Sequence, residues 1–427
     1  MTDDNLQLSR RRVLAGAGAI GVASAGAGLG TTAYFSDHEE FTGNSLTAGE
    51  LELFVKYQFA ADQGDYNDLY KDGIAKGTYH DEEHDPAECS YELDDVKPGD
   101  NGSLEFCFSI VNNPAYLWAC GMLTDEEAGR SGGHLADHLT ATLRYCEKDD
   151  EGERTDDGDV IAEGSFRDVL LALRNGVPLD ADGDRDVAIE DRACFDGSDD
   201  RKDFQDTCLC LDWEFPVRST DPDAELDNND AQAASMAFDL QFYAEQCRHN
   251  DGLTNPCVTS REGEDFAKFE EELAETVWHA RGIYGDGGGA ANRELDIRNP
   301  DDDPLDEGNF TWPNDDYVPF RLTVEDGDAK WDVGGEELSV EDAPVAVADG
   351  IGVTVKASAA DASIDVRDVR LNGSIPTGPD AVSTDDETVH ILLEGATLQE
   401  GDEVTGEVAM TWDDAPNAEG IGFRVDV

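Results

Sequence analysis

"GSLEFCFSIV", residues 102–111, alternates apolar and polar side chains, as an extended chain with two distinct faces requires. Leu104, Phe106, Phe108 and Ile110 fall on one of those faces. The turn formers of KPGDNG stand immediately before them, so the sequence predicts a strand that follows a tight turn. Strands with this period are typical of antiparallel sheets, which bury one face more than the other.

Similar patterns occur on both sides of this strand. ELELFVKYQF, residues 50–59, places its odd-numbered side chains on one apolar face, and LCLDWEFPV (209–217) and SMAFDLQFYAEQ (235–246) alternate in the same way. The only predicted helix in this half is SFRDVLLALRNG, residues 165–176, which Gly176 would end. We therefore expect a domain of antiparallel strands over residues 34–262.

The pattern changes in residues 263–314. Phe266, Phe269, Leu273 and Val277 have helical spacing, and residues 285–309 are acidic, aperiodic and rich in helix breakers. This segment predicts a helix followed by an acidic linker. Six short strand patterns then follow in residues 315–427, which predict a second, smaller β-sandwich. The expected fold class is all-β.

The composition indicates a salt-rich environment. The chain has 98 acidic and 30 basic residues, a net charge of -68, and yet 39% hydrophobic residues, enough for packed cores. An evenly acidic folded surface is typical of haloarchaeal proteins, because molar salt shortens the Debye length to about 3 Å. Such a surface repels nucleic acid and anionic membranes, so neither is an expected partner.

The amino terminus predicts export. Arg10 and Arg11 lie in SRRRVL, residues 9–14, the pattern that the twin-arginine route recognises, and the uncharged run of residues 13–30 follows. Small residues before Tyr34 predict cleavage between Ala33 and Tyr34, which makes residues 1–33 a signal peptide. The alternative is an uncleaved amino-terminal anchor.

Nine cysteines in an exported chain predict disulfides. Cys247 and Cys257 flank a loop rich in turn formers, so we expect a bridge between them. Cys208 and Cys210 would share one face of a strand, and each is expected to pair elsewhere. A structural zinc site that combines this pair with Cys194 is the alternative.

Several segments together resemble a known family. AYFSD (33–37), LTAGELEL (46–53), the segment that begins KPGDNGSLEFCF, and CLDWEFPVRSTDP are similar to parts of TasA and camelysin-type fibre proteins, haloarchaeal members included. The resemblance covers about the first 250 residues. It implies a jelly-roll subunit of a biofilm-type filament on the archaeal cell surface, outside the cell, with a dedicated signal peptidase, the export machinery and further copies of itself as partners. It also implies a donor strand at residues 34–46, in which we single out Tyr34, Phe35, Phe41 and Leu46.

Two segments could bind metals. His80, Glu83 and His84 follow the inverted zinc-protease order, and camelysin has been classed as a metallopeptidase, but Gly77 and Pro86 disfavour the helix that this chemistry needs. A secreted metallopeptidase is therefore the alternative, and a non-enzymatic chain that requires no cofactor is expected. Calcium is the ion that fits an acidic loop made of Asp180, Asp182, Asp184, Asp186 and Glu190.

Two further features concern carbohydrate. Asn101, Asn309 and Asn372 each begin an N-x-S/T sequence and are candidate glycosylation sites. Trp312, Trp331 and Trp412 could stack on sugars, which makes a polysaccharide-binding surface protein another alternative.

Overall fold

The computed structural model describes residues 51–64, 68–76, 91–148, 154–217, 227–263, 278–284, 294–343, 350–385, 387–413 and 420–427. Residues 52–427 form one compact unit. The fold is all-β, as expected: its described strands form four sheets, and its described helices are short. No helix in these ranges is long and apolar enough to cross a membrane.

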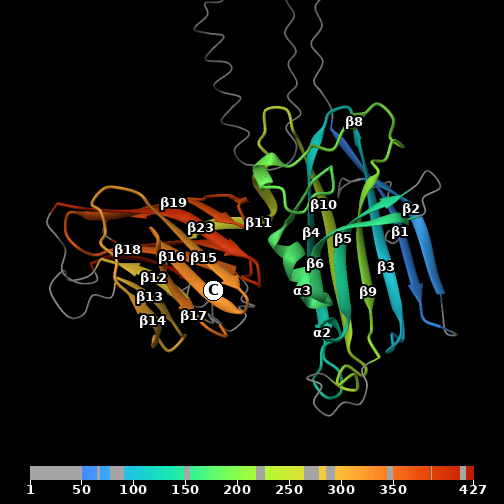
Figure 1. Ribbon diagram of the computed structural model, residues 1–427, viewed down its shortest axis with the longest axis horizontal. Helices are drawn as coiled ribbons and strands as arrows, with labels where there is room; N and C mark the ends of the chain where they lie inside the picture. Colours follow the sequence, from blue (N-terminus) through green and yellow to red (C-terminus); the bar gives the residue numbers. More distant parts are fainter. Residues whose placement is uncertain are drawn as a thin grey trace, which may run out of the picture. The chain divides into compact units, whose positions relative to one another are not determined.

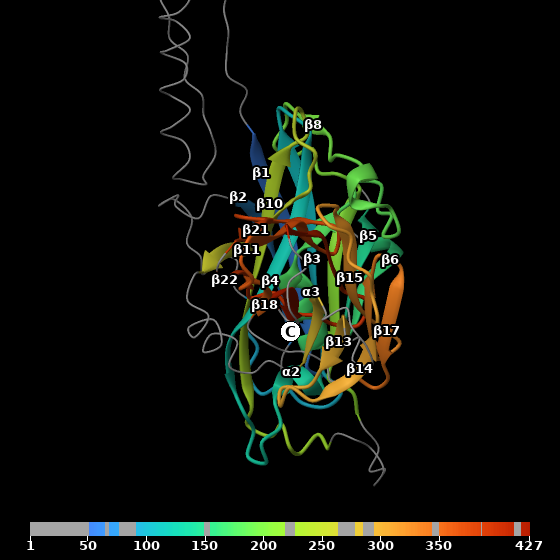
Figure 2. The same ribbon diagram turned by 90° about the vertical axis from the view of Figure 1, so that its left-hand side faces the viewer.

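The first half of the unit contains a large sheet and a small one, sheets A and B (Figure 1). Sheet A runs in the order β2 (Asp68–Lys76), β1 (Glu52–Asp62), β3 (Asn101–Val111), β9 (Thr207–Glu214), β5 (Thr140–Lys148) and β6 (Arg154–Ser165), with β8 (Gly197–Ser198) paired to β3. Sheet B has the order β10 (Ser235–Gln246), β4 (Ala115–Glu127) and β7 (Val177–Leu179). β10 and β4 run side by side in both views (Figure 2).

The strand predicted at residues 102–111 is confirmed as β3. Leu104, Phe106, Phe108 and Ile110 are all buried on its inner face. Glu105 and Ser109, on the other face, are buried as well. Lys148 forms an ion pair with Glu105 and covers it. β3 is therefore a central strand covered on both faces rather than the half-buried strand that the alternation predicts.

The predicted helix is confirmed as α3 (Phe166–Asn175). Ser165 caps it, since its hydroxyl accepts a hydrogen bond from the Asp168 N–H and the Asp168 carboxylate accepts one from the Ser165 N–H. Gly176 ends it with φ = 87°, a conformation that disfavours side chains. The apolar stripe of α3 packs beside β4, β5 and β6, so the helix covers the flank of sheet A that the three strands of sheet B leave open. A single turn, α2 (Leu135–His138), and a 3₁₀ turn, η2 (Ile189–Asp191), complete the described helices.

The second half contains sheets C and D. Sheet C runs in the order β14 (Pro304–Gly308), β13 (Leu295–Arg298), β12 (His279–Ile283), β24 (Ile421–Asp426), β18 (Gly350–Ala357), β22 (Thr388–Glu394), β11 (Thr254–Gly263) and β20 (Ile375–Thr377). Sheet D runs in the order β17 (Glu336–Val340), β16 (Asp328–Val333), β15 (Val318–Glu325), β23 (Glu403–Trp412), β19 (Ala362–Leu371) and β21 (Val382–Thr384). One apolar core lies between them, where the ring of Trp331 contacts those of Phe320 and Phe423 at 5.6 Å each.

The segment expected as a linker contributes strands to sheet C. β12, β13 and β14 lie within residues 263–314, and each pairs with its neighbour in antiparallel register. For β13 the difference is explained by Leu295 and Ile297, because two buried apolar residues suffice for a short strand among acidic ones. β11 is expected to belong to the first domain, which is predicted to end at residue 262. Instead it pairs with β22 and is part of sheet C. The helix expected at Phe266 to Val277 lies outside the described residues.

Candidate functional site

The outer strand of sheet B has an unpaired side. β10 is twelve residues long and pairs with β4 along its whole length, and no described strand pairs with its other side. The amides and carbonyls along that side are available to an added strand. We call this side of β10 the open edge.

The inner face of β10 is incompletely covered. Met236, Phe238, Leu240 and Phe242 alternate along this face, and all four side chains are half-buried. Phe242 contacts the rings of Phe106 and Phe108 at 5.0 Å each. Core-facing apolar side chains in a closed sandwich are normally buried further, so this row indicates a place where the sandwich can take more apolar surface.

The ring contacts also show what lies under the open edge. Because Phe242 lies against β3, and α3 covers the flank beyond β9, the open edge of β10 faces the β1 side of sheet A. β1 carries an inner row of buried apolar side chains, with Tyr57 stacked on Phe59 at 4.9 Å. A strand added to β10 would therefore extend sheet B toward β1, whose inner row is already buried.

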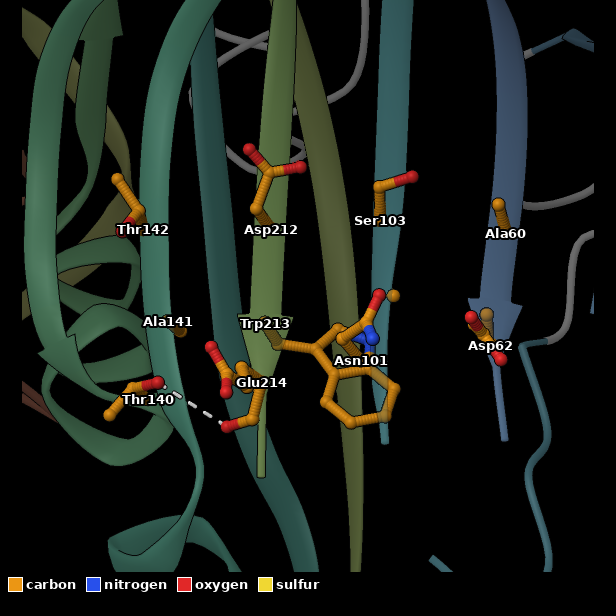
Figure 3. A pocket seen from close by; sticks show the side chains of 12 residues that line it. Ala60, Asp62, Asn101, Ser103, Thr140, Ala141, Thr142, Asp212, Trp213 and Glu214 are labelled. Atoms are coloured by element: carbon orange, nitrogen blue, oxygen red, sulfur yellow. Dashed lines mark hydrogen bonds between the residues drawn. The ribbon is translucent and has the colours of Figure 1, made fainter. Parts of the chain in front are cut away.

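A hollow lies on the other face of sheet A, at the ends of β1, β3, β9 and β5 (Figure 3). It has a volume of about 580 Å³ and is lined by small and acidic side chains, among them Ser103, Thr142 and Asp212. Asp212 accepts hydrogen bonds from both terminal nitrogens of Arg154, at 2.9 and 3.0 Å, and the Thr140 hydroxyl donates to the Glu214 carbonyl. The Asp212 carboxylate and the Thr140 hydroxyl thus each have a hydrogen-bond partner, and that of Asp212 is a residue outside the lining of the hollow.

Four disulfides join the described cysteines, and they correct one prediction. Cys247 pairs with Cys194 and Cys257 with Cys120, rather than with each other. Cys120 lies on β4 and Cys257 on β11, so the tertiary fold, and not the short loop between the two predicted partners, brings the sulfurs together. The ninth cysteine, Cys89, lies outside the described residues.

The prediction for the C-x-C pair is confirmed. Cys208 pairs with Cys107 and Cys210 with Cys146, so each binds a different neighbouring strand. The zinc alternative is wrong for these residues, because the sulfurs of Cys194, Cys208 and Cys210 are all in disulfides. Four disulfides indicate that the chain matures in an oxidising environment.

The acidic loop predicted to bind calcium uses its first carboxylate structurally. Asp180 is buried, and its side chain accepts hydrogen bonds from the N–H groups of Asp182, Asp184 and Ala193. Asp186 and Glu190 are both exposed. Across the described ranges, no group of three or more His, Cys, Asp or Glu side chains is placed to hold a metal ion.

The three sequons differ in their surroundings. Asn309 is exposed just after β14. Asn101 is exposed as well, but it begins β3 and pairs with β1 and β9. Asn372 is half-buried in a turn, with its side-chain amide hydrogen-bonded to Asp402 and its oxygen to the Glu403 N–H.

The three tryptophans of the second half are less accessible than sugar stacking requires. Trp331 is fully buried, Trp312 is 6% exposed, and Trp412 is half-buried against Tyr284. Their ring faces thus belong largely to the sandwich.

Several predicted residues lie outside the described ranges. They are the twin-arginine pair Arg10 and Arg11, the cleavage site Ala33 and Tyr34, the donor residues Phe35, Phe41 and Leu46, and the peptidase candidates His80, Glu83 and His84.

Two polar groups are important in the structure but were not singled out from the sequence. Arg192 is buried, donates to the carbonyls of Leu117 and Gly252, and lies over the rings of Tyr116 and Trp118. Burial lowers the pKa of its guanidinium to about 10. The side-chain amide of Asn175, at the end of α3, donates hydrogen bonds to the Thr397 carbonyl and to the Asp402 carboxylate, in the segment before β23. Neither residue lies in a motif, so only the positions of their distant partners could have identified them.

Comparison with protein-family models finds no match, and comparison with curated proteins finds none either.

Proposed function

We propose that this chain is a secreted, halophilic subunit of an extracellular, biofilm-type filament that assembles by donor-strand addition, and that its first sandwich is a jelly roll of the TasA and camelysin type. The observation that carries the proposal is the open edge of β10 above its half-buried row of apolar side chains. In the filament, residues 34–46 of one subunit would pair with the open edge of the next.

The energetics of such an addition depend on apolar anchors. Each backbone hydrogen bond gained is worth a net of about 0.5–1.5 kcal/mol, whereas ordering each residue costs about 1–2 kcal/mol. Backbone pairing alone therefore does not hold a donor strand. Burial of a Phe side chain adds about 1.5–3 kcal/mol, so Phe35 and Phe41 would decide the balance against the row that includes Phe238 and Leu240.

The charge of the chain makes assembly salt-dependent. The full chain has a net charge of -68, so two subunits repel each other strongly at low ionic strength. Molar salt screens this repulsion over about 3 Å and strengthens apolar burial. We expect filaments at molar KCl and dissociation on dilution into low salt.

The first test removes the donor segment. A chain of residues 34–427 should form filaments at molar KCl under the electron microscope, and a chain of residues 47–427 should fold but remain monomeric in sedimentation. A synthetic peptide of residues 34–46 should bind the shorter chain. Identical filaments from both chains would contradict donor-strand addition by this segment.

The acceptor side has a matched pair of variants within the same test. Leu240→Asp places a charge on the inner face of β10, and Ala237→Asp places the same charge on its exposed outer face. We expect Leu240→Asp to abolish binding of the peptide and Ala237→Asp to leave it within about twofold. Equal binding by both variants, with disulfides and unfolding transitions intact, would place the acceptor site elsewhere.

A further inference from the structure

The three sequons offer three different environments for one chemical modification. N-linked glycosylation needs an asparagine amide that is free to react and a Ser or Thr hydroxyl, two residues later, that the transferase can reach. Export by the twin-arginine route would deliver a chain that is already folded, so the folded structure would decide which sequon is available.

Asn372 is held at every polar atom of its side chain. Its amide nitrogen donates to the Asp402 carboxylate at 2.7 Å, and its oxygen accepts from the Glu403 N–H at 2.8 Å. Ser374, the third residue of this sequon, is 2% exposed, and its hydroxyl donates to the Leu371 carbonyl at 2.6 Å. It also accepts a hydrogen bond from Asn255. A transferase could not bind this tripeptide without unfolding the turn.

Asn101 is held by its backbone. It opposes Asp62 on β1 and Glu214 on β9, and Ser103 opposes Ala60 and Asp212 on the same two strands. The whole tripeptide thus lies between two strands of sheet A. A transferase that has to surround the acceptor would first have to break the sheet on both sides.

Asn309 has neither constraint. Asn309 and Thr311 are both exposed, in the segment between β14 and β15, and no described residue hydrogen-bonds either side chain. Phe310, the residue between them, holds the segment in place. Its N–H donates to the Glu294 carboxylate at 3.1 Å, and its ring contacts the ring of Trp312 at 4.7 Å. Phe310 therefore holds the backbone in place, and the side chains of Asn309 and Thr311 on either side of it are exposed to solvent.

We infer that Asn309 is the N-glycosylation site of the folded chain, and that Asn101 and Asn372 stay unmodified. The donor is an oligosaccharide linked through phosphate to a membrane lipid. The Asn309 amide nitrogen forms a bond to the anomeric carbon, the bond from that carbon to the phosphate oxygen breaks, and the lipid phosphate leaves with the electron pair. The amide proton passes to a base of the transferase. This inference requires folding before modification, but it does not depend on filament assembly.

The test is tandem mass spectrometry of proteolytic peptides from the protein that its own cells secrete. We expect an oligosaccharide on Asn309 and unmodified masses for the peptides with Asn101 and Asn372. Thr311→Ala should abolish the modification, and the matched variant Thr311→Ser, which preserves the sequon, should retain it. Unmodified Asn309, an oligosaccharide on either of the other two residues, or modification that survives Thr311→Ala would overturn the inference.

Discussion

At the residue scale, Asp402 shows how one half-buried carboxylate joins distant parts of the chain. Its two oxygens accept hydrogen bonds from the side-chain amides of Asn175 and Asn372, both at 2.7 Å, and from the Gln399 N–H at 2.9 Å. Burial nevertheless raises the pKa of Asp402 from 3.8 to about 6, against the opposing effect of these three donors. The folded chain therefore binds a proton at this carboxylate more tightly than the unfolded chain does.

This shift predicts a pH dependence of stability. Because the folded pKa is the higher one, the contribution of Asp402 is most favourable below about pH 4 and is lost as the pH rises through 6. The free energy of unfolding should fall by about 3 kcal/mol across this window on account of Asp402. Asp402→Asn removes the titration, so its stability relative to the native chain should rise by that amount between pH 4 and pH 7.

The comparison between variants is essential, because His279 titrates in the opposite sense. Burial, Arg424 and Arg281 lower the pKa of His279 from 6.5 to about 4, so its contribution to stability is lost as the pH falls from about 6.5 to about 4. Denaturant unfolding at molar KCl should be measured at each pH for the native chain, Asp402→Asn and the exposed control Glu341→Gln. Parallel curves for the native chain and Asp402→Asn would contradict the shifted pKa.

At the element scale, two disulfides fasten three adjacent strands of sheet A. Cys208 on β9 lies in register with Cys107 on β3 and with Cys146 on β5, and Cys210 lies two residues further along. All four sulfurs belong to one buried cluster, and Phe204 packs against it. These strands thus cannot separate without breaking covalent bonds.

The cluster predicts that two disulfides of similar span differ in their effect on stability. Cys146–Cys210 closes a separation of 64 residues and Cys194–Cys247 one of 53, so chain entropy assigns each about 4 kcal/mol, with a difference of only about 0.2 kcal/mol. Cys146 and Cys210 are fully buried, whereas Cys194 and Cys247 are half-buried. Replacing both members of the buried pair by Ala should cost about 1–2 kcal/mol more, because it also leaves a cavity. Equal losses in denaturant unfolding would show that packing adds nothing.

At the scale of the whole molecule, the strands of the first half and those of the second are joined by more than the chain. β11 is bound to β4 through Cys120–Cys257 and yet pairs with β22 in sheet C. The side chain of Asn175, at the end of α3, donates to the Thr397 carbonyl at 2.8 Å and accepts from the Thr397 N–H at 2.9 Å. These contacts make residues 52–427 one unit rather than two independent sandwiches.

This junction predicts that Asn175→Ala lowers the free energy of unfolding by about 3 kcal/mol, since it leaves buried backbone groups of Thr397 without partners. The matched control is Asn250→Ala, which removes an exposed asparagine with a single hydrogen bond to the Gln246 carbonyl. We expect the control to change stability by less than about 0.5 kcal/mol. Similar values for both variants in denaturant unfolding would mean that the junction contributes little.

Local pattern was sufficient for much of the fold. The strands around Leu104 and Leu240, the helix that ends at Gly176 and the separate partners of Cys208 and Cys210 all follow from periodicity and turn chemistry over a few residues. The strand β13 did not follow, because its two apolar residues, Leu295 and Ile297, are too few to stand out among acidic neighbours. The strand β14, which pairs with β13, has no buried residue at all. Their pairing partners supply the stability that their own sequence lacks.

The sequence by itself determined the all-β class, the positions of several strands such as β3 and β10, and the expectation of an oxidising environment, because these depend on local alternation and on composition. Only the tertiary structure decided that Cys120 meets Cys257, that Asn175 reaches Thr397, and that β10 is left with an open edge. Each of these is a contact, or a missing contact, between segments far apart in the chain. The alternation of apolar and polar residues in a strand indicates which of its faces is apolar. Which strand pairs with it depends on the packing of the whole sheet.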